Sequence, residues 1–505
     1  MMQKKEHREM KKFLIGLILL CVSFVQSQDF SKPREVFSRS FMFTRPASFN
    51  IEMDYQLWHN FVYAKEGPLY GGFQAIGFYQ NSRSKAKVAR YFLINKKNEL
   101  LISGDANTGQ ILKRDIRAEW VNLPDDFKGK MSLCPEQKQY GFNLMYSQDL
   151  KKFFDFWLLK DWTVGVELPI SRVTNNINFC QYDMSSSGTQ LNVEPDIHSA
   201  FNQCDWNYSK IPTCEQSLTR PEALKFTIGR YFPVDDPFQL ASFMTLSIPL
   251  AKKADPEFLY SPFVGLNKHW AFGTTVLMQV LLNRDPEKVA STIFVELNGL
   301  FLIKNHQCRT FDLKKKPWSR YMQYVRKGSA PGETVPGVNV LTFPTRVRPF
   351  GIADFACGWR VTAGAFEGEI GFDIWGHGDE RLQLRYPVQS PFYAPCPGGL
   401  NEFGIAGSGT IIEKGQPTVA TASASTIACQ AVDDKSFVSI TDNDIDLCSA
   451  AASNALNYKF HAACGLQHMG DSANGFAGLG FFYEFPKRNS PLATYGFWFK
   501  VGGTF

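Results

Sequence analysis

Ionisable side chains recur at every second position within several otherwise apolar stretches of this 505-residue chain. In residues 366–374, for example, Glu367, Glu369 and Asp373 alternate with phenylalanine and isoleucine. Successive side chains of a strand point to opposite faces, so one face of this stretch is charged and the other is apolar. A charged face that lines a water-filled space selects ions and small polar solutes, and charges of both signs predict a weak ion preference. The candidates for such a lining are Glu167, Arg230, Glu296, Arg360, Glu367, Glu369, Asp373, Lys459, His461 and Lys500.

Two segments carry residue types that hydrolases use. Ser408 lies in AGSGT, which falls short of a nucleophile elbow and is not followed by a helical pattern. His377, Asp379 and Glu380 stand together in GHGDERL, which reads as a polar turn after a strand. The sequence contains no Cys-x-x-Cys pair, and its histidines are scattered. We therefore predict no enzyme activity, no catalytic residues, no metal site and no cofactor.

The elements that would position the charges are strands. The alternating runs extend over about nine to eleven residues, which is the length that a tilted strand needs to cross a bilayer. A soluble β-sandwich alternates as well, but its strands are shorter and its polar faces are rich in Lys, Thr and Glu. We predict an all-β fold, a transmembrane antiparallel up-and-down β-barrel of about 14 strands within a range of roughly 12–18. Its periplasmic turns are expected to be short and its extracellular loops long.

Composition narrows the function classes. A formal charge of +6 over the whole chain is too small for a nucleic-acid-binding surface, so nucleic acid is not expected as a partner. Aromatic residues make up 14% of the chain, yet no apolar run after residue 28 approaches the ~20 residues of a membrane-spanning helix. This combination is typical of a chain whose apolar residues are spread two apart.

The pattern also predicts a division of the chain. Residues 1–28 join a basic stretch to a short apolar run and read as a cleaved signal peptide. Residues 29–48 form an N-terminal extension that is a candidate for entering the lumen. Residues 49–505 form the barrel, with long loops near 83–138, 173–222, 304–316 and 377–454. Residues 90–105 are expected to form a small hairpin, and 266–269 and 486–492 to form short turns.

Ten cysteines remain after the signal peptide, an even number that permits disulfides in an exported protein. The candidates closest in sequence are Cys204 with Cys214 and Cys429 with Cys448. Their pairing cannot be deduced from spacing.

The chain closes with TYGFWFKVGGTF, in which Tyr495, Phe497, Phe499 and the terminal Phe505 share one face of a strand. This ending resembles the C-terminal signature of porin-like outer-membrane β-barrels of Gram-negative bacteria. The resemblance implies that the barrel-assembly machinery recognises the last strand, which then closes the barrel against the first. It also implies the cell outer membrane as location, with outer-membrane lipid, lipopolysaccharide and small solutes as partners. Assembly into a homo-oligomer stays open.

Three functions fit such a barrel. The first is a porin-like channel for passive diffusion of small hydrophilic solutes or ions through a lumen of mixed charge. The alternative is a transporter for hydrophobic solutes in which an N-terminal hatch carries Phe37, Phe41, Phe43 and Phe49. A surface barrel with a structural or adhesive role is the third.

Overall fold

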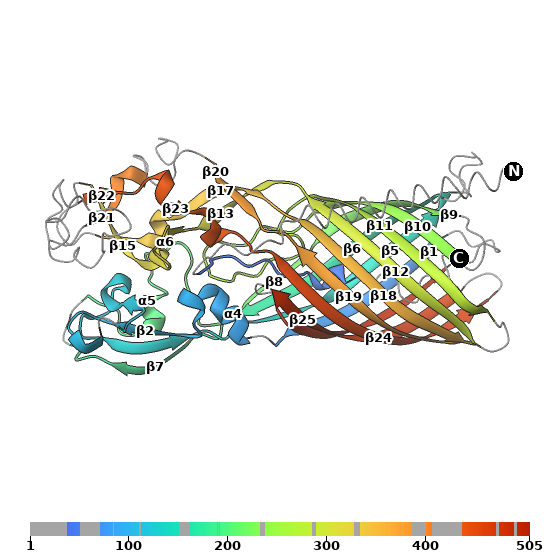
Figure 1. Ribbon diagram of the computed structural model, residues 1–505, viewed down its shortest axis with the longest axis horizontal. Coiled ribbons are helices and arrows are strands. Elements are labelled where there is room, and N and C mark those ends of the chain that lie inside the picture. The colour runs from blue at the N-terminus through green and yellow to red at the C-terminus, as the bar shows by residue number, and fades with distance from the viewer. Residues whose placement is uncertain are drawn as a thin grey trace.

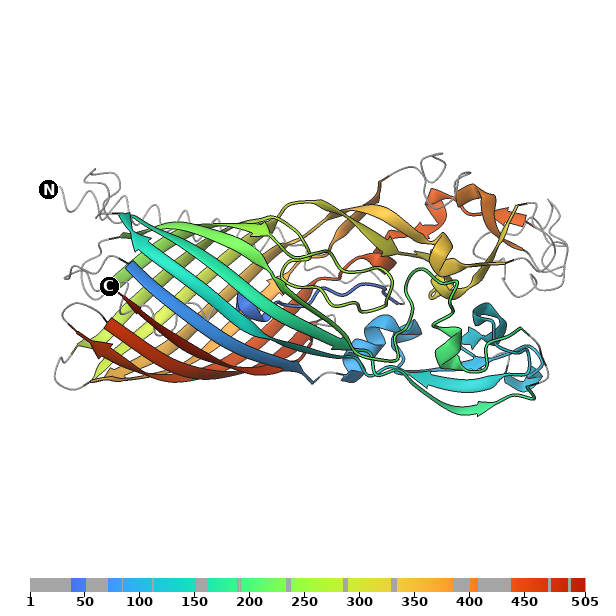
Figure 2. The same cartoon turned by 180° about the vertical axis from the view of Figure 1, so that it is seen from behind.

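A closed antiparallel β-barrel and a folded cap at one of its ends make up the computed structural model (Figure 1). Figure 2 shows the same two parts from behind. The structure describes residues 38–50, 71–83, 85–110, 113–150, 162–188, 190, 192–232, 238–284, 289–327, 334–385, 400–406, 437–470, 474–488 and 492–504. Within these residues, none of the helices is long and apolar enough to span a membrane.

Twelve strands close the barrel in the order β5-β1-β26-β25-β24-β19-β18-β12-β11-β10-β9-β6, and β6 pairs again with β5. The predicted fold class is therefore confirmed, with a strand number at the lower bound of the range and not the favoured 14. The strands are β1 (Gly71–Ser82), β5 (Glu136–Asp149), β6 (Trp162–Asn176), β9 (Ala223–Phe232), β10 (Phe238–Pro249), β11 (Ala271–Arg284), β12 (Ala290–Leu302), β18 (Gly351–Ala363), β19 (Phe366–His377), β24 (Ala455–Met469), β25 (Asn474–Arg488) and β26 (Thr494–Thr504). A further strand, β8 (Gln216–Pro221), continues the pairing with β6 beyond β9.

Most connections at one end of the barrel are short, and most of those at the other end are long. At the turn end, the connections are 150–161, 233–237, 285–289, 364–365 and 470–473. At the cap end, they are 83–135, 177–215, 250–270, 303–350, 378–454 and 489–493. The short turn predicted at 486–492 is confirmed, since residues 489–493 join β25 to β26. The short turn predicted at 266–269 is wrong, because these residues belong to the long connection 250–270. The loop expected at 304–316 continues to residue 350, because its strands pair within the cap and not with the barrel.

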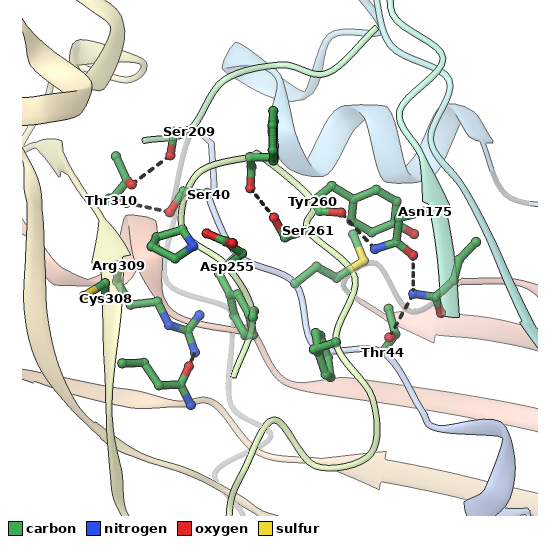
Figure 3. Close-up of a pocket in the computed structure, with 18 residues that line it drawn as sticks. Ser40, Thr44, Asn175, Ser209, Asp255, Tyr260, Ser261, Cys308, Arg309 and Thr310 are labelled. Carbon is green, nitrogen blue, oxygen red and sulfur yellow. Dashed lines mark hydrogen bonds between the residues drawn. The ribbon is translucent and has the colours of Figure 1, made fainter. Parts of the chain in front are cut away.

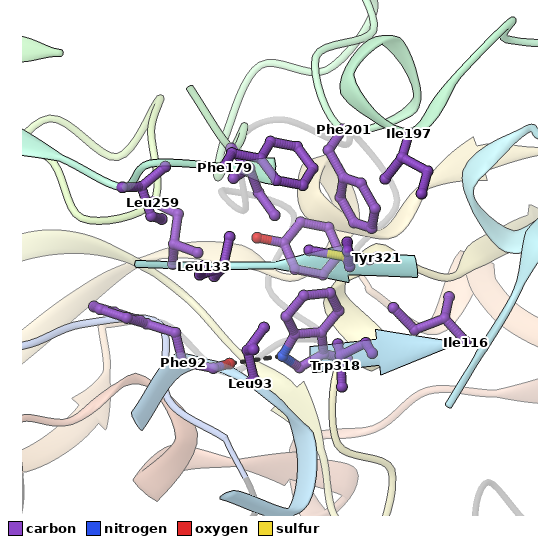
Figure 4. Packing of buried hydrophobic residues seen from close by; sticks show 14 of the residues in the cluster. Phe92, Leu93, Ile116, Leu133, Phe179, Ile197, Phe201, Leu259, Trp318 and Tyr321 are labelled. Atoms are coloured by element: carbon purple, nitrogen blue, oxygen red, sulfur yellow. Dashed lines mark hydrogen bonds between the residues drawn. The ribbon is translucent and has the colours of Figure 1, made fainter. Parts of the chain in front are cut away.

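The first half of the cap is built on the sheet β3-β2-β4-β7. Its core draws buried side chains from several cap-end connections, among them Phe92, Phe201, Leu259 and Trp318 (Figure 4). The Trp318 indole N–H donates to the Phe92 carbonyl at 2.7 Å, which ties two of these connections together. The elements are α4 (Lys85–Phe92), η2 (Ile94–Lys96), β2 (Glu99–Ser103), η3 (Thr108–Gln110), β3 (Ile116–Arg117), η4 (Ala118–Val121), β4 (Lys128–Ser132), β7 (Cys180–Ser185) and α5 (Ile197–Ala200).

The hairpin predicted for 90–105 is wrong. Residues 85–92 form the helix α4, and β2 pairs with β4, about thirty residues further along the chain, and with β3. An alternating run predicts a strand but not the strand with which it pairs. The segment expected to pair with β2 instead contains the end of the helix α4.

The second half of the cap packs around Phe311, Tyr324 and Phe343, which are buried at its centre. Three small sheets surround them, β13-β17-β20, β16-β15-β21-β22 and β14-β23. The elements are β13 (Asn305–Thr310), β14 (Asp312–Leu313), η6 (Ser319–Tyr321), β15 (Gln323–Arg326), β16 (Val335–Pro336), α6 (Gly337–Val340), β17 (Thr342–Arg348), β20 (Arg381–Leu384), η7 (Leu400–Glu402), β21 (Phe403–Ala406), β22 (Phe437–Ser439), η9 (Asp442–Asp444), β23 (Ile445–Asp446) and η10 (Leu447–Ala450).

Candidate channel lumen and N-terminal plug

The barrel strands turn their charged faces inward. Every sequence-predicted lumen residue except Arg230 is buried in the barrel interior: Glu167, Glu296, Arg360, Glu367, Glu369, Asp373, Lys459, His461 and Lys500. Alternate residues of the same strands are exposed on the outer surface, where Ile370, Phe460 and Phe497 are each 56% exposed. Cys357 and Cys464 lie on this outer face as well. The apolar outer face and charged inner face follow from the two-residue period of a strand.

Arg230 is not a lumen residue. It shares its face of β9 with Phe226 and Ile228, which are exposed on the outside of the barrel. Its register partner on β6 is Trp162, and its guanidinium lies 5.8 Å from the ring centroid of Phe232. Lys225 points inward, so the odd-numbered residues of β9 face the lumen. Arg230 is even-numbered and therefore lies on the outer face.

Residues 38–50 run from the cap into the barrel, and we call them the N-terminal plug (Figures 1 and 2). They include the whole described part, residues 38–48, of the extension expected at 29–48, and Phe37 lies outside the described residues. In the plug, η1 (Ala47–Phe49) forms a single turn inside the barrel. Arg39 donates from Nη1 to the carbonyls of Cys448 and Ala451 at 3.0 and 2.7 Å, which holds the outer end of the plug to the cap.

Arg45 is the centre of the contacts between plug and barrel. Its guanidinium lies 2.5 Å from an Asp354 carboxylate oxygen, 3.4 Å from one of Asp373 and 3.6 Å from one of Glu484. The arginine side chain is only 2% exposed, and none of the three carboxylates exceeds 5%. A buried cation thus joins strands β18, β19 and β25 through the plug.

Polar contacts on both sides of Arg45 add to this attachment. Lys459 pairs with Asp373 at 2.5 Å and donates to the Asn50 side-chain oxygen at 2.9 Å. The Gln139 amide donates to the Arg45 carbonyl at 3.0 Å and accepts from the Ala47 backbone N–H at 2.8 Å. On the β9 side, the Lys225 ammonium pairs with Glu167 and lies 4.1 Å from the centroid of the Phe49 ring. The plug is therefore bound by backbone and side-chain groups around much of the barrel wall.

A second ionic cluster lies nearer the turn end. Arg360 contacts Glu367 and Glu369 at 2.8 Å each, and the His461 ring nitrogen is 3.5 Å from Glu369. The lumen thus has one ionic layer that includes Arg45 of the plug and a second layer in which residues of β18, β19 and β24 pair with one another.

Aromatic side chains pack around the plug where it passes from the cap into the barrel. The Phe43 ring packs against Phe263, Phe350 and His377, with centroid distances of 5.7, 4.9 and 5.4 Å. Phe41, one of the expected hatch residues, lies beneath the Arg309 guanidinium at 3.2 Å from its ring centroid.

The cavities along the plug are small. One at the junction of barrel and cap has a volume of about 40 Å³ and is lined in part by Ser40, Thr44 and Arg309 (Figure 3). Another beside Asp354 and Trp375 measures about 10 Å³. Spaces of this size hold one or a few water molecules. In this state the described plug and strands leave no room in these two cavities for a solute.

Among the buried side chains of the barrel strands, acidic groups outnumber basic ones. Seven carboxylates are buried there: Glu167, Glu296, Asp354, Glu367, Glu369, Asp373 and Glu484. Four cations accompany them: Lys225, Arg360, Lys459 and Lys500. Arg45 of the plug supplies a further positive charge. A lumen without the plug would therefore be net negative on its described strands.

Sequence reasoning missed Arg45, Asp354 and Glu484. Asp354 lies on the same face of β18 as Arg360, and Glu484 lies on the same face of β25 as Phe482. The two-residue period of a strand is therefore sufficient to predict that both carboxylates point into the lumen. Arg45 has no such signal, because it lies outside any strand and its partners are more than 300 residues away.

The predicted disulfides do not form among the described cysteines. Cys204 and Cys214 are exposed free thiols, and Cys429, the expected partner of Cys448, lies outside the described residues. Backbone hydrogen bonds hold the segment around Cys204 and Cys214 instead, including those from Ile211 to Phe201 and from Lys210 to Glu257. In the C-terminal strand, Phe497 and Phe499 point outward as predicted, and Phe505 lies outside the described residues.

No protein-family model and no curated protein matches this chain. Among solved structures, it is similar to an outer membrane channel from Pseudomonas putida F1, with 9% identity and a TM-score of 0.35 over 86% of this chain and 96% of that one. The transport unit of the autotransporter AIDA-I from Escherichia coli is 8% identical, with a TM-score of 0.32 over 88% and 92% of the two chains. A FadL homologue from Pseudomonas aeruginosa is 7% identical, with a TM-score of 0.26 over 87% and 90%. Similarities this low say nothing about which solute this chain handles.

Proposed function

We propose that this protein is an outer-membrane channel for small hydrophilic solutes or ions that residues 38–50 hold closed. The membrane location is supported by the apolar outer face of the closed barrel and by strands of 10–15 residues. The cap end is expected to face the exterior and the turn end the periplasm, as is usual for such barrels.

The observation that carries the proposal is the position of Arg45 among Asp354, Asp373 and Glu484. Carboxylates buried close together repel one another unless a cation or water neutralises them. The plug supplies that cation in the closed state, and water would supply solvation once the plug has left. The same residues thus stabilise a closed lumen and line an open one.

The lining favours hydrophilic over hydrophobic solutes. An apolar molecule in the lumen would have to displace water from seven carboxylates and four cations without replacing their hydrogen bonds. The excess of carboxylates further predicts that cations pass more readily than anions. This proposal retains the N-terminal hatch of the alternative hypothesis. It replaces the hydrophobic solute of that hypothesis with a hydrophilic one.

Single-channel recording in a planar bilayer tests the proposal. The full chain should be closed for most of the recording, and a variant lacking residues 38–50 should show steady, cation-selective steps. Both proteins must first show the shift in electrophoretic mobility on heating that marks a folded barrel. A folded deletion variant that conducts no more than the full chain would refute the proposal and favour a structural or adhesive role for the capped barrel.

A further inference from the structure

One face of the sheet β13-β17-β20 carries a group of cations, and we call Lys304, Arg346, Arg348 and Arg381 the basic face. In the register of the sheet, Arg348 lies directly opposite Arg381, and Arg346 lies opposite Gln383 on one side and His306 on the other. On the opposite face, Phe343 and Val347 of β17 are buried in the cap, and β13 contributes the buried polar side chains of Gln307 and Arg309. The sheet therefore holds Arg346, Arg348 and Arg381 together on its outer face, and Lys304 directly precedes β13.

These cations line a hollow that is also apolar. Its volume is about 780 Å³, and its walls include the basic face together with Phe301, Ile303 and Phe350. Phe301 and Ile303 are 47% and 51% exposed. The hollow thus offers positive charge on one wall and exposed hydrocarbon on another.

The hollow lies at the cap-side edge of the exposed apolar side chains that surround the barrel. Phe301 is near the cap end of β12, and the backbone N–H of Ile303 donates to the carbonyl of Trp270, whose side chain is itself exposed. Strands β13 and β20 begin, and β17 ends, where barrel and cap meet (Figure 1). Aromatic side chains at this level mark the boundary between the hydrocarbon and the headgroups of a membrane. The basic face is therefore level with the headgroups of the leaflet on the cap side.

Within the described residues, no ion pair neutralises the charges of the basic face. No carboxylate of the described residues lies within ion-pair distance of its four side chains. The nearest acidic residues in sequence are engaged elsewhere: Glu380 accepts from Arg309 at 3.2 Å, and Asp379 accepts from the backbone N–H of Asn454 at 2.6 Å. Like charges directly opposite each other on neighbouring strands destabilise a sheet. This arrangement is expected where an anion from outside supplies the missing charge.

The neighbouring histidine responds to the same positive field. Burial lowers the pKa of His306, and the charges of Arg385, Lys253 and Arg346 lower it further. His306 lies outside the barrel strands, on β13.

We propose that the basic face and its hollow bind the phosphate groups of an anionic glycolipid in the outer leaflet, with an acyl chain lying against Phe301 and Ile303. The guanidinium groups suit phosphate because their planar N–H donors bind two oxygens at once. The exposed phenylalanine and isoleucine favour a lipid over a free phosphate ion, which has no apolar part to cover them. This inference depends on the membrane placement of the barrel but not on channel activity.

Native mass spectrometry of the full chain in detergent tests it, with bisphosphorylated lipid A as the probe. The test variant is Arg346→Gln/Arg348→Gln/Arg381→Gln. A matched control, Lys314→Gln/Lys315→Gln/Lys327→Gln, removes the same charge from exposed cap residues away from the hollow. Each cation near a charged lipid surface contributes about a fivefold gain in affinity, so the test variant should bind roughly a hundredfold more weakly. The control should bind like the wild type, and Arg348→Gln alone should lose about fivefold.

Two further probes separate lipid from ion. Lipid A stripped of its phosphates should bind weakly to the wild type, and inorganic phosphate should not match the affinity of the lipid. Equal binding by the test and control variants, or equal retention of the dephosphorylated lipid, would overturn the proposal. Inorganic phosphate binding as tightly as the lipid would overturn the choice of a lipid. The single variant keeps the test decisive if the triple variant does not fold.

Discussion

Replacing Arg45 with glutamine should open the channel. The change removes the buried cation that lies between Asp354, Asp373 and Glu484 and leaves the rest of the plug in place. The three carboxylates would then face one another with less compensation in the closed state, whereas water solvates them in the open state. The free-energy cost therefore falls on the closed state alone.

The size of the effect follows from the burial of the site. Removing one partner of a buried ion pair typically costs about 3–5 kcal/mol. Lys459 still pairs with Asp373, so we expect the lower end of this range. At about 1.4 kcal/mol for each factor of ten, a cost of about 3 kcal/mol raises the ratio of open to closed channels by roughly a hundredfold.

Single-channel recordings of folded wild-type and variant proteins measure this ratio as the open probability. Arg45→Lys keeps the charge and should stay mostly closed, while Arg230→Gln changes a residue on the outer face and should have no effect. An open probability of Arg45→Gln equal to that of the wild type, with an intact barrel, would show that the ion pairs of Arg45 do not hold the plug.

Three further results are expected. Replacing the β19 carboxylates Glu367, Glu369 and Asp373 with their amides should shift the reversal potential of an opened channel toward anions, because the lumen loses negative charge; an unshifted potential would place these groups away from the ion pathway. Arg348→Gln should raise the thermal stability of the cap by up to about 1 kcal/mol, since it removes a like-charge pair across two strands, and a lower melting temperature would argue against repulsion there. Phe201→Ala should destabilise the cap by about 3–5 kcal/mol while leaving the barrel folded, because the ring is fully buried among Trp206, Trp318 and Tyr321. Limited proteolysis would report the loss of the cap, and equal resistance of variant and wild type would contradict this packing argument.

The barrel itself could be predicted from the sequence because its signal is local. The two-residue period of a strand places Glu367, Glu369 and Asp373 on one face and Ile370 on the other wherever the strand pairs. The same alternation along β9 places Arg230 on the outer face, opposite to Lys225. The sequence therefore contains the information that excludes Arg230 from the lumen.

Strand number, cap and plug depended on contacts between distant residues. Runs in the long connections alternate as barrel strands do, yet they pair with one another because the cap core gathers side chains as far apart as Phe92 and Trp318. Arg45 meets Asp354 across 309 residues, and no local pattern specifies that pairing. The sequence alone determined which faces of the strands are apolar and which are charged. Only the tertiary structure decided that a cation from outside the strands occupies the space that they enclose, because its binding site exists only once the barrel has closed.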